Sequence, residues 1–223
     1  RKLWGGTAGL GELIAVVSGK GGTGKTSVCA GIATALAESG KRVLCVDCDV
    51  GLRNLDISLG MSDCGGLSFL DVSEFGYELE NAPHHPIYDN LSFLTAPMNR
   101  SPEDINTESF IALFQRARER FDYIFLDAPA GVDAGFRLVC AAADSFLVVT
   151  GAGPAAVRDA ARVGELLELA GKTNAKLIVN HRRRDGHRRS AIAGHCSGGL
   201  SCNSGRSLRP APAEICQPMR SHP

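Results

Sequence analysis

Short apolar runs alternate with longer amphipathic stretches along residues 12–180 of the 223-residue chain. The short runs are rich in β-branched residues and predict strands at 13–18, 42–47, 91–95, 122–127, 145–150 and 175–180. Apolar residues at helical spacing predict helices at 25–39, 104–120, 133–143 and 154–170. Because strands that alternate with helices form parallel sheets covered on both faces, we expect an α/β protein with a mainly parallel sheet.

A glycine-rich octet stands between the first predicted strand and the first predicted helix. Residues 19–26 read Gly-Lys-Gly-Gly-Thr-Gly-Lys-Thr, which fits the phosphate-loop pattern G-x-x-x-x-G-K-[ST]. In this setting, backbone N–H groups and the positive end of a helix dipole face a polyphosphate. Lys25 would bind the β- and γ-phosphates, and the Thr26 hydroxyl would ligate Mg²⁺. The alternative is a glycine-rich turn that binds nothing.

Lys20 gives this loop a second lysine, and here the chain resembles the MinD/ParA family of ATPases. The resemblance covers residues 12–180 and continues through Val-Asp-Cys-Asp-Val-Gly-Leu-Arg-Asn-Leu-Asp at 46–56, through 121–131 and through 177–180. The string Gly-Leu-Arg-Asn-Leu-Asp is similar to the MinD branch of the family more than to the ParA branch. The resemblance implies a three-layer α/β/α P-loop NTPase that uses ATP and Mg²⁺.

The resemblance also assigns roles to charged residues. Lys20 would reach across a dimer to the nucleotide of the other subunit and stabilise charge on the transferring phosphoryl group, as an arginine finger does. Asp127 ends an apolar strand as a Walker B aspartate does, and would hold Mg²⁺ with Thr26 and the nearby Asp47. Asp49 would position the attacking water from switch I. The alternatives are a solvated loop lysine at position 20 and a turn cap at position 127.

Two further residues complete the predicted site. Gly131 follows Ala-Pro-Ala at 128–130, a segment that resembles switch II, and can approach the γ-phosphate because it has no Cβ. Asn180 ends the last recognisable strand, and by resemblance its amide would read the adenine edge. The predicted catalytic residues are Lys20, Lys25 and Asp49. The predicted metal-binding residues are Thr26, Asp47 and Asp127. The predicted nucleotide-binding residues are Gly19, Lys20, Gly21, Gly22, Thr23, Gly24, Lys25, Thr26, Ser27, Gly131 and Asn180.

Composition is average, with 44% hydrophobic and 22% charged residues, which suits one α/β domain over residues 11–180. No run approaches the 18 apolar residues of a membrane-spanning helix. Residues 1–10 lack the apolar core of a secretion signal, so we treat them as a flanking segment. Among the eight cysteines only Cys45 and Cys48 have the C-x-x-C spacing, and no second such pair accompanies them, so we predict neither a zinc site nor a disulfide framework and favour a reducing, cytoplasmic location.

The family pattern ends after Asn180. Residues 181–223 hold 8 Arg and 2 acids, whereas residues 1–180 hold 16 Lys and Arg against 22 acids. This tail is rich in Gly, Ser, Arg and Cys and has few large apolar residues, which predicts disorder and a sheet without the family's last strand and helix. Three interpretations stay open: a shifted reading frame, a basic tail for nucleic acid or anionic lipid, and a metal site from His195, Cys196 and Cys202.

The resemblance implies an ATP-dependent homodimer that switches between states and acts in placement of the division septum or of flagella, with a protein that regulates its ATPase. Peripheral membrane association is implied for intact relatives, but this C-terminal sequence has no amphipathic helix to support it. The acidic body argues against nucleic acid as a partner, and so against a ParA-type partition ATPase. A metabolic enzyme with the same loop, an iron–sulfur ATPase and an inactive, truncated family member stay open as well.

Overall fold

A parallel six-stranded sheet forms the centre of residues 9–180, which are the residues described by this computed structural model. All neighbouring strands are parallel. Their order across the sheet is β3 (Leu91–Leu94), β2 (Val43–Asp47), β4 (Tyr123–Asp127), β1 (Glu12–Val17), β5 (Ser145–Gly151) and β6 (Ala175–Asn180). The six predicted strands are therefore confirmed, together with the parallel α/β architecture.

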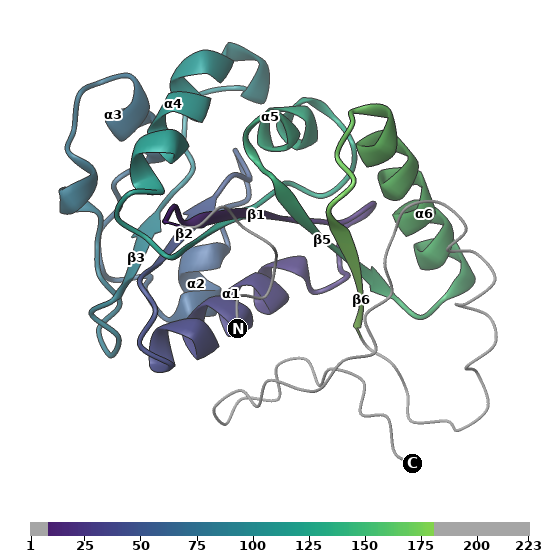
Figure 1. The fold of residues 1–223 in the computed structure, drawn as a ribbon, viewed down its shortest axis with the longest axis horizontal. Helices are drawn as coiled ribbons and strands as arrows, with labels where there is room; N and C mark the ends of the chain where they lie inside the picture. The colour runs from purple at the N-terminus through teal and green to yellow at the C-terminus, as the bar shows by residue number, and fades with distance from the viewer. Residues whose placement is uncertain (1–8, 181–223) are drawn as a thin grey trace.

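Helices cover both faces of the sheet, which gives three layers (Figure 1). One face carries α1 (Lys25–Glu38) and α2 (Leu55–Leu59). The other face carries α3 (Phe69–Ser73), α4 (Thr107–Ala117), α5 (Ala134–Ala142) and α6 (Pro154–Leu169). Two 3₁₀ turns, η1 (Leu79–Asn81) and η2 (Pro102–Asp104), lie in the connections. The four longer helices match the predicted ones, whereas α2 and α3 were not predicted.

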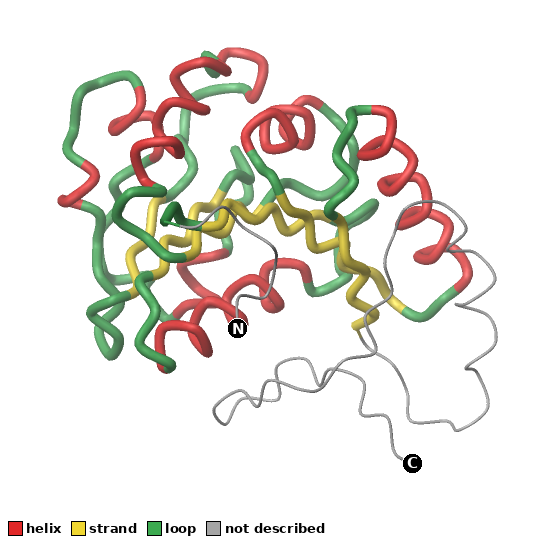
Figure 2. The backbone as a smooth tube through the Cα atoms, viewed as in Figure 1, coloured by secondary structure: helices red, strands yellow, loops and turns green. Residues whose placement is uncertain are grey.

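The central strands are buried on both faces, so their sequences are continuous apolar runs. Along β1, Ile14 and Val16 face the α1 layer, while Leu13, Ala15 and Val17 face the opposite layer. Successive side chains of a strand point to opposite faces, so one strand contributes to two separate cores. The tube in Figure 2 shows the strands as one twisted layer between the helices.

The carboxyl ends of β1, β2 and β4 meet at one edge of the sheet. Asp127 is the last residue of β4 and pairs in register with Val16 of β1 and Asp47 of β2. In open parallel sheets, ligands bind at this edge. The glycine loop after β1 and both aspartates are therefore brought together here by the strand order.

Some sequence predictions fall outside the described residues. The tail at 181–223, including His195, Cys196 and Cys202, lies wholly outside them, as does most of the flanking segment at 1–10. The predicted loss of a last strand and helix concerns the same undescribed part of the chain. Within residues 9–180, no helix has both the length and the apolarity needed to cross a membrane.

Candidate functional site

The phosphate loop runs from the end of β1 to the start of α1. Gly22 and Gly24 have φ values of 76° and 81°, so the loop turns twice through the left-handed region before α1 begins at Lys25. The Ser18 hydroxyl donates to the carbonyl of Lys20 at 3.0 Å and steadies the opening of the loop. The first N–H groups of α1 have no acceptor inside the helix and are available to an anion.

Gly19 lies against α6. A Cβ added at Gly19 would lie 2.6 Å from the carbonyl oxygen of Asp159 and 2.7 Å from its Cβ. Both distances are shorter than ordinary van der Waals contacts. The carbonyl oxygen belongs to the backbone of a helix, and displacing it would cost free energy. The first glycine of the motif therefore allows the loop to pack on α6.

Lys25 and Asp127 form a buried ion pair. Lys25 Nζ donates to Asp127 Oδ1 at 2.6 Å, and the two side chains are only 8% and 2% exposed. Burial raises the pKa of Asp127, and the charge of Asp47 acts in the same direction, while Lys25 and a hydrogen bond from the Thr26 side chain oppose the rise. Asp47 is a second buried carboxylate beside this pair, so two buried carboxylates stand against one lysine and leave the site rich in negative charge.

Asp47 organises the loop that follows β2. Its Oδ1 accepts the N–H of Asp49 at 2.9 Å, and its Oδ2 accepts the N–H groups of Asn54 and Leu55, both at 3.1 Å. This carboxylate is 1% exposed and adjacent in register to Asp127. Asp47 therefore fixes the backbone of the predicted switch I next to the predicted metal site.

Asp49 and Gly131 lie on the loops that flank this centre. Asp49 is half-buried; burial raises its pKa, and the charge of Asp47 adds to that, while Lys25 and a backbone hydrogen bond from Leu52 oppose it. The Gly131 N–H donates to the carbonyl of Ser18 at 3.0 Å, so the loop after β4 is tied to the start of the phosphate loop. Predicted switch I, switch II and the phosphate loop thus converge at one edge of the sheet.

Lys20 lies on the outer side of the loop. Its Nζ is 4.0 Å from Asp159 Oδ2 of α6, and its side chain is 48% exposed. An ion pair this long and this exposed holds the lysine weakly. Lys20 can therefore leave Asp159 at little cost, as a lysine that acts on a second molecule must.

Asn180 contacts the phosphate loop directly. Its side-chain amide nitrogen donates to the carbonyl of Thr23 at 2.9 Å, which joins the end of β6 to the loop after β1. The Thr23 hydroxyl is buried and has no hydrogen-bond partner. The predicted role of Asn180 in reading a base stays a prediction, and the structure adds a role in holding the loop.

The residues at this edge fit Mg²⁺ and a polyphosphate. Asp47, Asp127 and Thr26 offer hard oxygen donors, which Mg²⁺ prefers, and the excess of buried carboxylate charge over Lys25 favours a cation. Within residues 9–180, no group of three or more His, Cys, Asp or Glu side chains could hold a metal ion by itself. A Mg²⁺ ion here would therefore need oxygen atoms from a bound phosphate as well, as is usual for this metal.

Sequence reasoning missed the part played by Asp159. This residue limits the space at Gly19 and lies opposite Lys20, yet it is far from both along the chain. It sits on an amphipathic helix where an exposed or half-exposed acid is ordinary, so no local pattern marks it. Only the packing of α6 on the phosphate loop identifies it.

This parallel sheet, with a phosphate loop after its first strand and aspartates at the ends of two neighbouring strands, defines a P-loop nucleotide-binding domain of the α/β class. Residues 14–195 match the CobQ/CobB/MinD/ParA nucleotide binding domain, so the chain belongs to that family. The resemblance found in the sequence is thereby confirmed.

Known relatives are named for division-site selection. The chain is 41% identical over 175 residues to the septum site-determining protein MinD of Synechocystis, covering 78% of this chain and 66% of that protein. The MinC:MinD complex of Aquifex aeolicus superimposes with a TM-score of 0.75 at 35% identity, covering 85% of this chain and 79% of that one. MinD of Pyrococcus horikoshii, complexed with Mg-ADP, gives a TM-score of 0.70 at 27% identity, with coverage of 85% and 79%. The chain spans slightly less than two thirds of the length of the curated relatives it matches.

Proposed function

We propose that this chain is a Mg²⁺-dependent ATP-binding and ATP-hydrolysing switch of the MinD type, which dimerises on ATP and acts in placement of the division septum or flagella. The observation that carries the proposal is the buried Lys25–Asp127 pair beside Asp47, directly under the phosphate loop. The MinD relatives named above support the same function.

Lys25 would change partners when a nucleotide binds. Its ammonium group is held by Asp127, and we expect the phosphates to draw it away because they carry more negative charge. Asp127 and Thr26 would then hold the metal. Bound Mg²⁺ would neutralise charge on the phosphates. Asp49 would orient the attacking water from the loop that Asp47 fixes.

Lys20 would complete the site of a second molecule. It is exposed at the loop surface and only weakly paired with Asp159, so a partner's nucleotide can compete for it. A cation supplied in trans makes hydrolysis depend on dimerisation, because each site is complete only in the dimer. The complex of the Aquifex relative with MinC supports the expectation of a protein partner.

ATPase and nucleotide-binding assays on a small set of variants test the proposal. Lys25→Ala should lose nucleotide binding, because the phosphates lose their buried cation. Lys20→Ala and Asp49→Ala should keep binding and lose turnover. Lys41→Ala is the matched control, since Lys41 is an exposed lysine in the connection after α1 and its replacement should leave both binding and turnover unchanged. Equal turnover in all four variants would refute the proposal.

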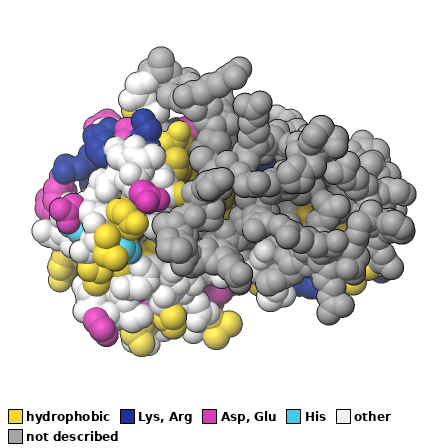
Figure 3. All heavy atoms as spheres, turned by 90° about the horizontal axis from the view of Figure 1, so that it is seen from below, with side chains coloured by type: hydrophobic (Ala, Val, Ile, Leu, Met, Phe, Trp, Pro, Cys, Tyr) yellow, Lys and Arg dark blue, Asp and Glu magenta, His cyan; other side chains and the backbone are white. Residues whose placement is uncertain are grey.

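The partition ATPase is the alternative from the ParA branch. A ParA-type protein needs a basic surface for DNA, whereas in the described part of the face shown in Figure 3 the basic side chains lie beside acidic ones. Saturable binding to non-specific duplex DNA in the presence of Mg-ATP would favour this alternative. Septum placement predicts no such binding.

An iron–sulfur ATPase has less support. Cys140 is the cysteine after β4 that such a protein would need at a dimer surface, but it is buried in α5. Burial raises its pKa to about 12, which disfavours the thiolate that a cluster requires. Cys29 and Cys45 are also buried, as is ordinary for free cysteines in a protein core. A colourless purified protein is therefore expected.

A further inference from the structure

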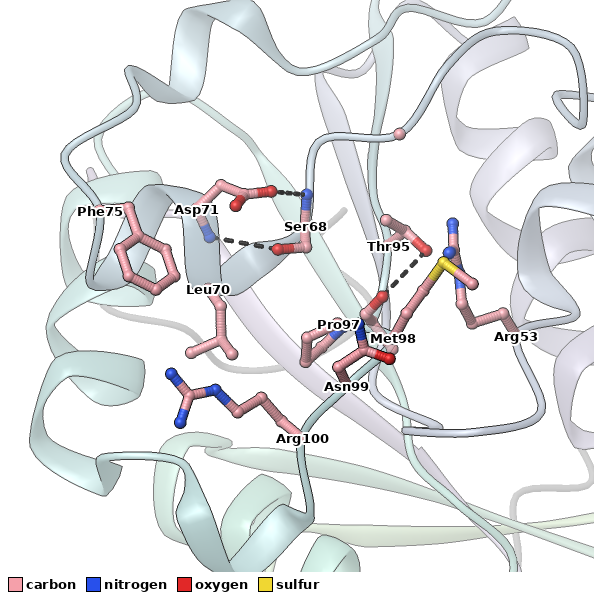
Figure 4. Close-up of a pocket in the computed structure, with 12 residues that line it drawn as sticks. Arg53, Ser68, Leu70, Asp71, Phe75, Thr95, Pro97, Met98, Asn99 and Arg100 are labelled. Carbon is pink, nitrogen blue, oxygen red and sulfur yellow. Dashed lines mark hydrogen bonds between the residues drawn. The ribbon is translucent and has the colours of Figure 1, made fainter.

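A pocket of about 360 Å³ lies at the carboxyl end of β3, beyond the residues assigned to the phosphate site (Figure 4). Its walls come from α3, from the segment at 95–100 that follows β3, and from the two loops that carry Arg53 and Gly66. None of the residues predicted to bind nucleotide or metal lines it. The proposed ATPase function leaves this pocket without a role.

The pocket carries excess positive charge. Arg53 and Arg100 line it from different segments, and Figure 4 shows their guanidinium groups on opposite sides of the pocket. Neither forms an ion pair with another residue in the described part of the chain. Asp71 is the one acid among the lining residues, and its carboxylate is occupied in the capping box of α3, where it accepts the Ser68 N–H at 2.8 Å.

Two further acids lie close to Arg100 along the chain but do not line the pocket. Glu103 and Asp104 follow Arg100 closely in the chain, but both are engaged by Ser101. The Ser101 hydroxyl donates to Glu103 at 2.6 Å, and the Ser101 N–H donates to Asp104 at 3.1 Å. Both carboxylates therefore serve the start of η2 and do not line the pocket.

Arg53 is held in place without a partner for its charge. Its Nε atom is buried and has no hydrogen-bond acceptor. A Cβ added at Gly66 would lie 3.3 Å from Arg53 Nη2, so the glycine leaves room for the guanidinium. Leaving a buried donor of a charged group unsatisfied costs free energy, and an anionic ligand that pairs with the guanidinium would compensate its charge.

Apolar side chains extend the site beyond the pocket. Leu70 and Pro97 line it and are buried, whereas Phe75 and Met98 at its margin are 58% and 75% exposed. A small free acid could pair with the arginines but would leave Phe75 and Met98 in water. A peptide that combines acidic and apolar side chains would satisfy both the charges and the apolar margin.

We propose that this pocket binds an acidic segment of a partner protein, in which carboxylates flank an apolar side chain. The carboxylates pair with Arg53 and Arg100, in charge-assisted hydrogen bonds that favour arginine. The apolar side chain packs on Leu70 and Pro97 between them. Charge complementarity selects an acidic partner over a basic one.

Arg53 also links the pocket to the phosphate site. The next two residues, Asn54 and Leu55, donate their N–H groups to Asp47. A ligand that fixes Arg53 therefore fixes the loop that Asp47 organises, and binding at either site should affect the other reciprocally. This coupling, unlike the binding itself, rests on the proposed function.

Fluorescence anisotropy with a labelled, end-capped peptide Glu-Leu-Asp-Phe-Glu tests the binding on the full chain without nucleotide. Saturable binding is expected, and the amide counterpart Gln-Leu-Asn-Phe-Gln should bind at least about tenfold more weakly, because charge-assisted hydrogen bonds are lost. Absence of saturable binding, or equal binding of the two peptides, would overturn the proposal. Displacement by free glutarate as effective as by unlabelled peptide would also overturn it, because the site would then serve a small acid.

Substitutions locate the binding. Arg53→Gln and Arg100→Gln should each weaken peptide binding about tenfold, since each removes a charged partner. Arg116→Gln is the matched control, because Arg116 is an exposed arginine near the end of α4 that does not line the pocket. If circular dichroism shows that Arg53→Gln does not fold, the affinity of the Arg100→Gln variant tests the site by itself, because Arg100 is exposed. Unchanged affinity in Arg100→Gln would contradict the site.

Repeating the peptide titration with Mg-ATP tests the coupling separately. The dissociation constant of the peptide should change by at least about threefold if Arg53 transmits the nucleotide-bound state of the loop that Asp47 organises. An unchanged constant in protein that does bind ATP would refute the coupling but not the binding. Peptide binding in protein that fails to bind ATP would instead count against the proposed ATPase function alone.

Discussion

Strand β4 has an aspartate-based ion pair at each end, and the two pairs differ in their surroundings. At the amino end, Arg42 Nη2 lies 3.0 Å from Asp122 Oδ1, with side chains 56% and 38% exposed. At the carboxyl end, Lys25 Nζ lies 2.6 Å from Asp127 Oδ1, with side chains 8% and 2% exposed. One strand therefore carries two ion pairs of the same kind, one exposed to solvent and one buried in the protein interior.

The pKa values of the two aspartates move in opposite directions. The hydrogen bond from Arg42 lowers the pKa of Asp122, whereas burial raises the pKa of Asp127 despite the lysine beside it. Desolvation can exceed the attraction between two buried charges, so such a pair is poor evidence for stabilisation. The outer pair adds slightly to stability, and the inner pair keeps a lysine and a carboxylate ready for ligands.

Removing one partner of the inner pair should have the largest effect on stability. Without nucleotide, Lys25→Ala should lower the free energy of unfolding by roughly 3 kcal/mol, because Asp127 stays buried without its cation. The double variant Lys25→Met/Asp127→Leu should recover much of this loss, since no buried charge remains unpaired at Asp127. Urea denaturation measures both, and a double variant less stable than the single one would contradict this account of the pair.

Packing of the phosphate loop on α6 predicts the next effect. Gly19→Ala should lower the free energy of unfolding by about 1–3 kcal/mol, because the new methyl group would overlap the backbone of Asp159. Gly21→Ala is the control, since a Cβ there meets nothing within 4 Å, and it should change stability by less than about 0.5 kcal/mol. Thermal melting monitored by circular dichroism compares the two variants. Equal melting temperatures would mean that the loop does not depend on α6.

Thr23 offers a substitution that should stabilise the carboxyl edge. Its hydroxyl is buried without a hydrogen-bond partner, so Thr23→Val should raise the free energy of unfolding by about 1 kcal/mol. The Asn180 bond goes to the Thr23 carbonyl and is retained in the variant. Thr34→Val is the comparison, because the Thr34 hydroxyl donates to the Ala30 carbonyl at 2.8 Å and its removal should not stabilise. A less stable Thr23→Val would indicate a partner for the hydroxyl.

The outer pair should give the smallest effect. Asp122→Asn should cost less than about 1 kcal/mol, because solvent screens the exposed pair. A carboxyl whose folded pKa is lowered contributes stability above its ordinary pKa of about 4 and loses it as the pH falls through the lowered value. The difference between wild type and Asp122→Asn should therefore vanish in acid and shrink in high salt. A difference that grows below pH 4 would contradict this assignment.

The sequence predicts the sheet well because buried parallel strands are continuous apolar runs. All six strands were found in this way, and the glycine motif located the phosphate loop between the first strand and α1. Helices α2 and α3 were missed because five residues are too few to show a helical period. The capping box of α3, Ser68 with Asp71, was a signal that could have found it.

The sequence does not predict the contacts within the site as well as it predicts the sheet. The roles of Asp159 beside Gly19 and of Asn180 on Thr23 depend on contacts between distant segments, and the role of Asp47 as a backbone acceptor depends on how the following loop folds back on it. A residue type at a strand end indicates which ligand it could hold, but not which backbone groups it already serves. The buried Lys25–Asp127 pair was likewise visible only once β4 lay beside β1.

Mixing two inactive variants tests the central claim most directly. In a dimer of Lys20→Ala with Asp49→Ala, one site has both its own Asp49 and a partner's Lys20, so a one-to-one mixture should recover roughly a quarter of wild-type ATP turnover. Each variant alone should stay inactive at the same total concentration. A mixture no more active than its components, although mass measurements show that they dimerise with ATP, would contradict a lysine that acts across the dimer.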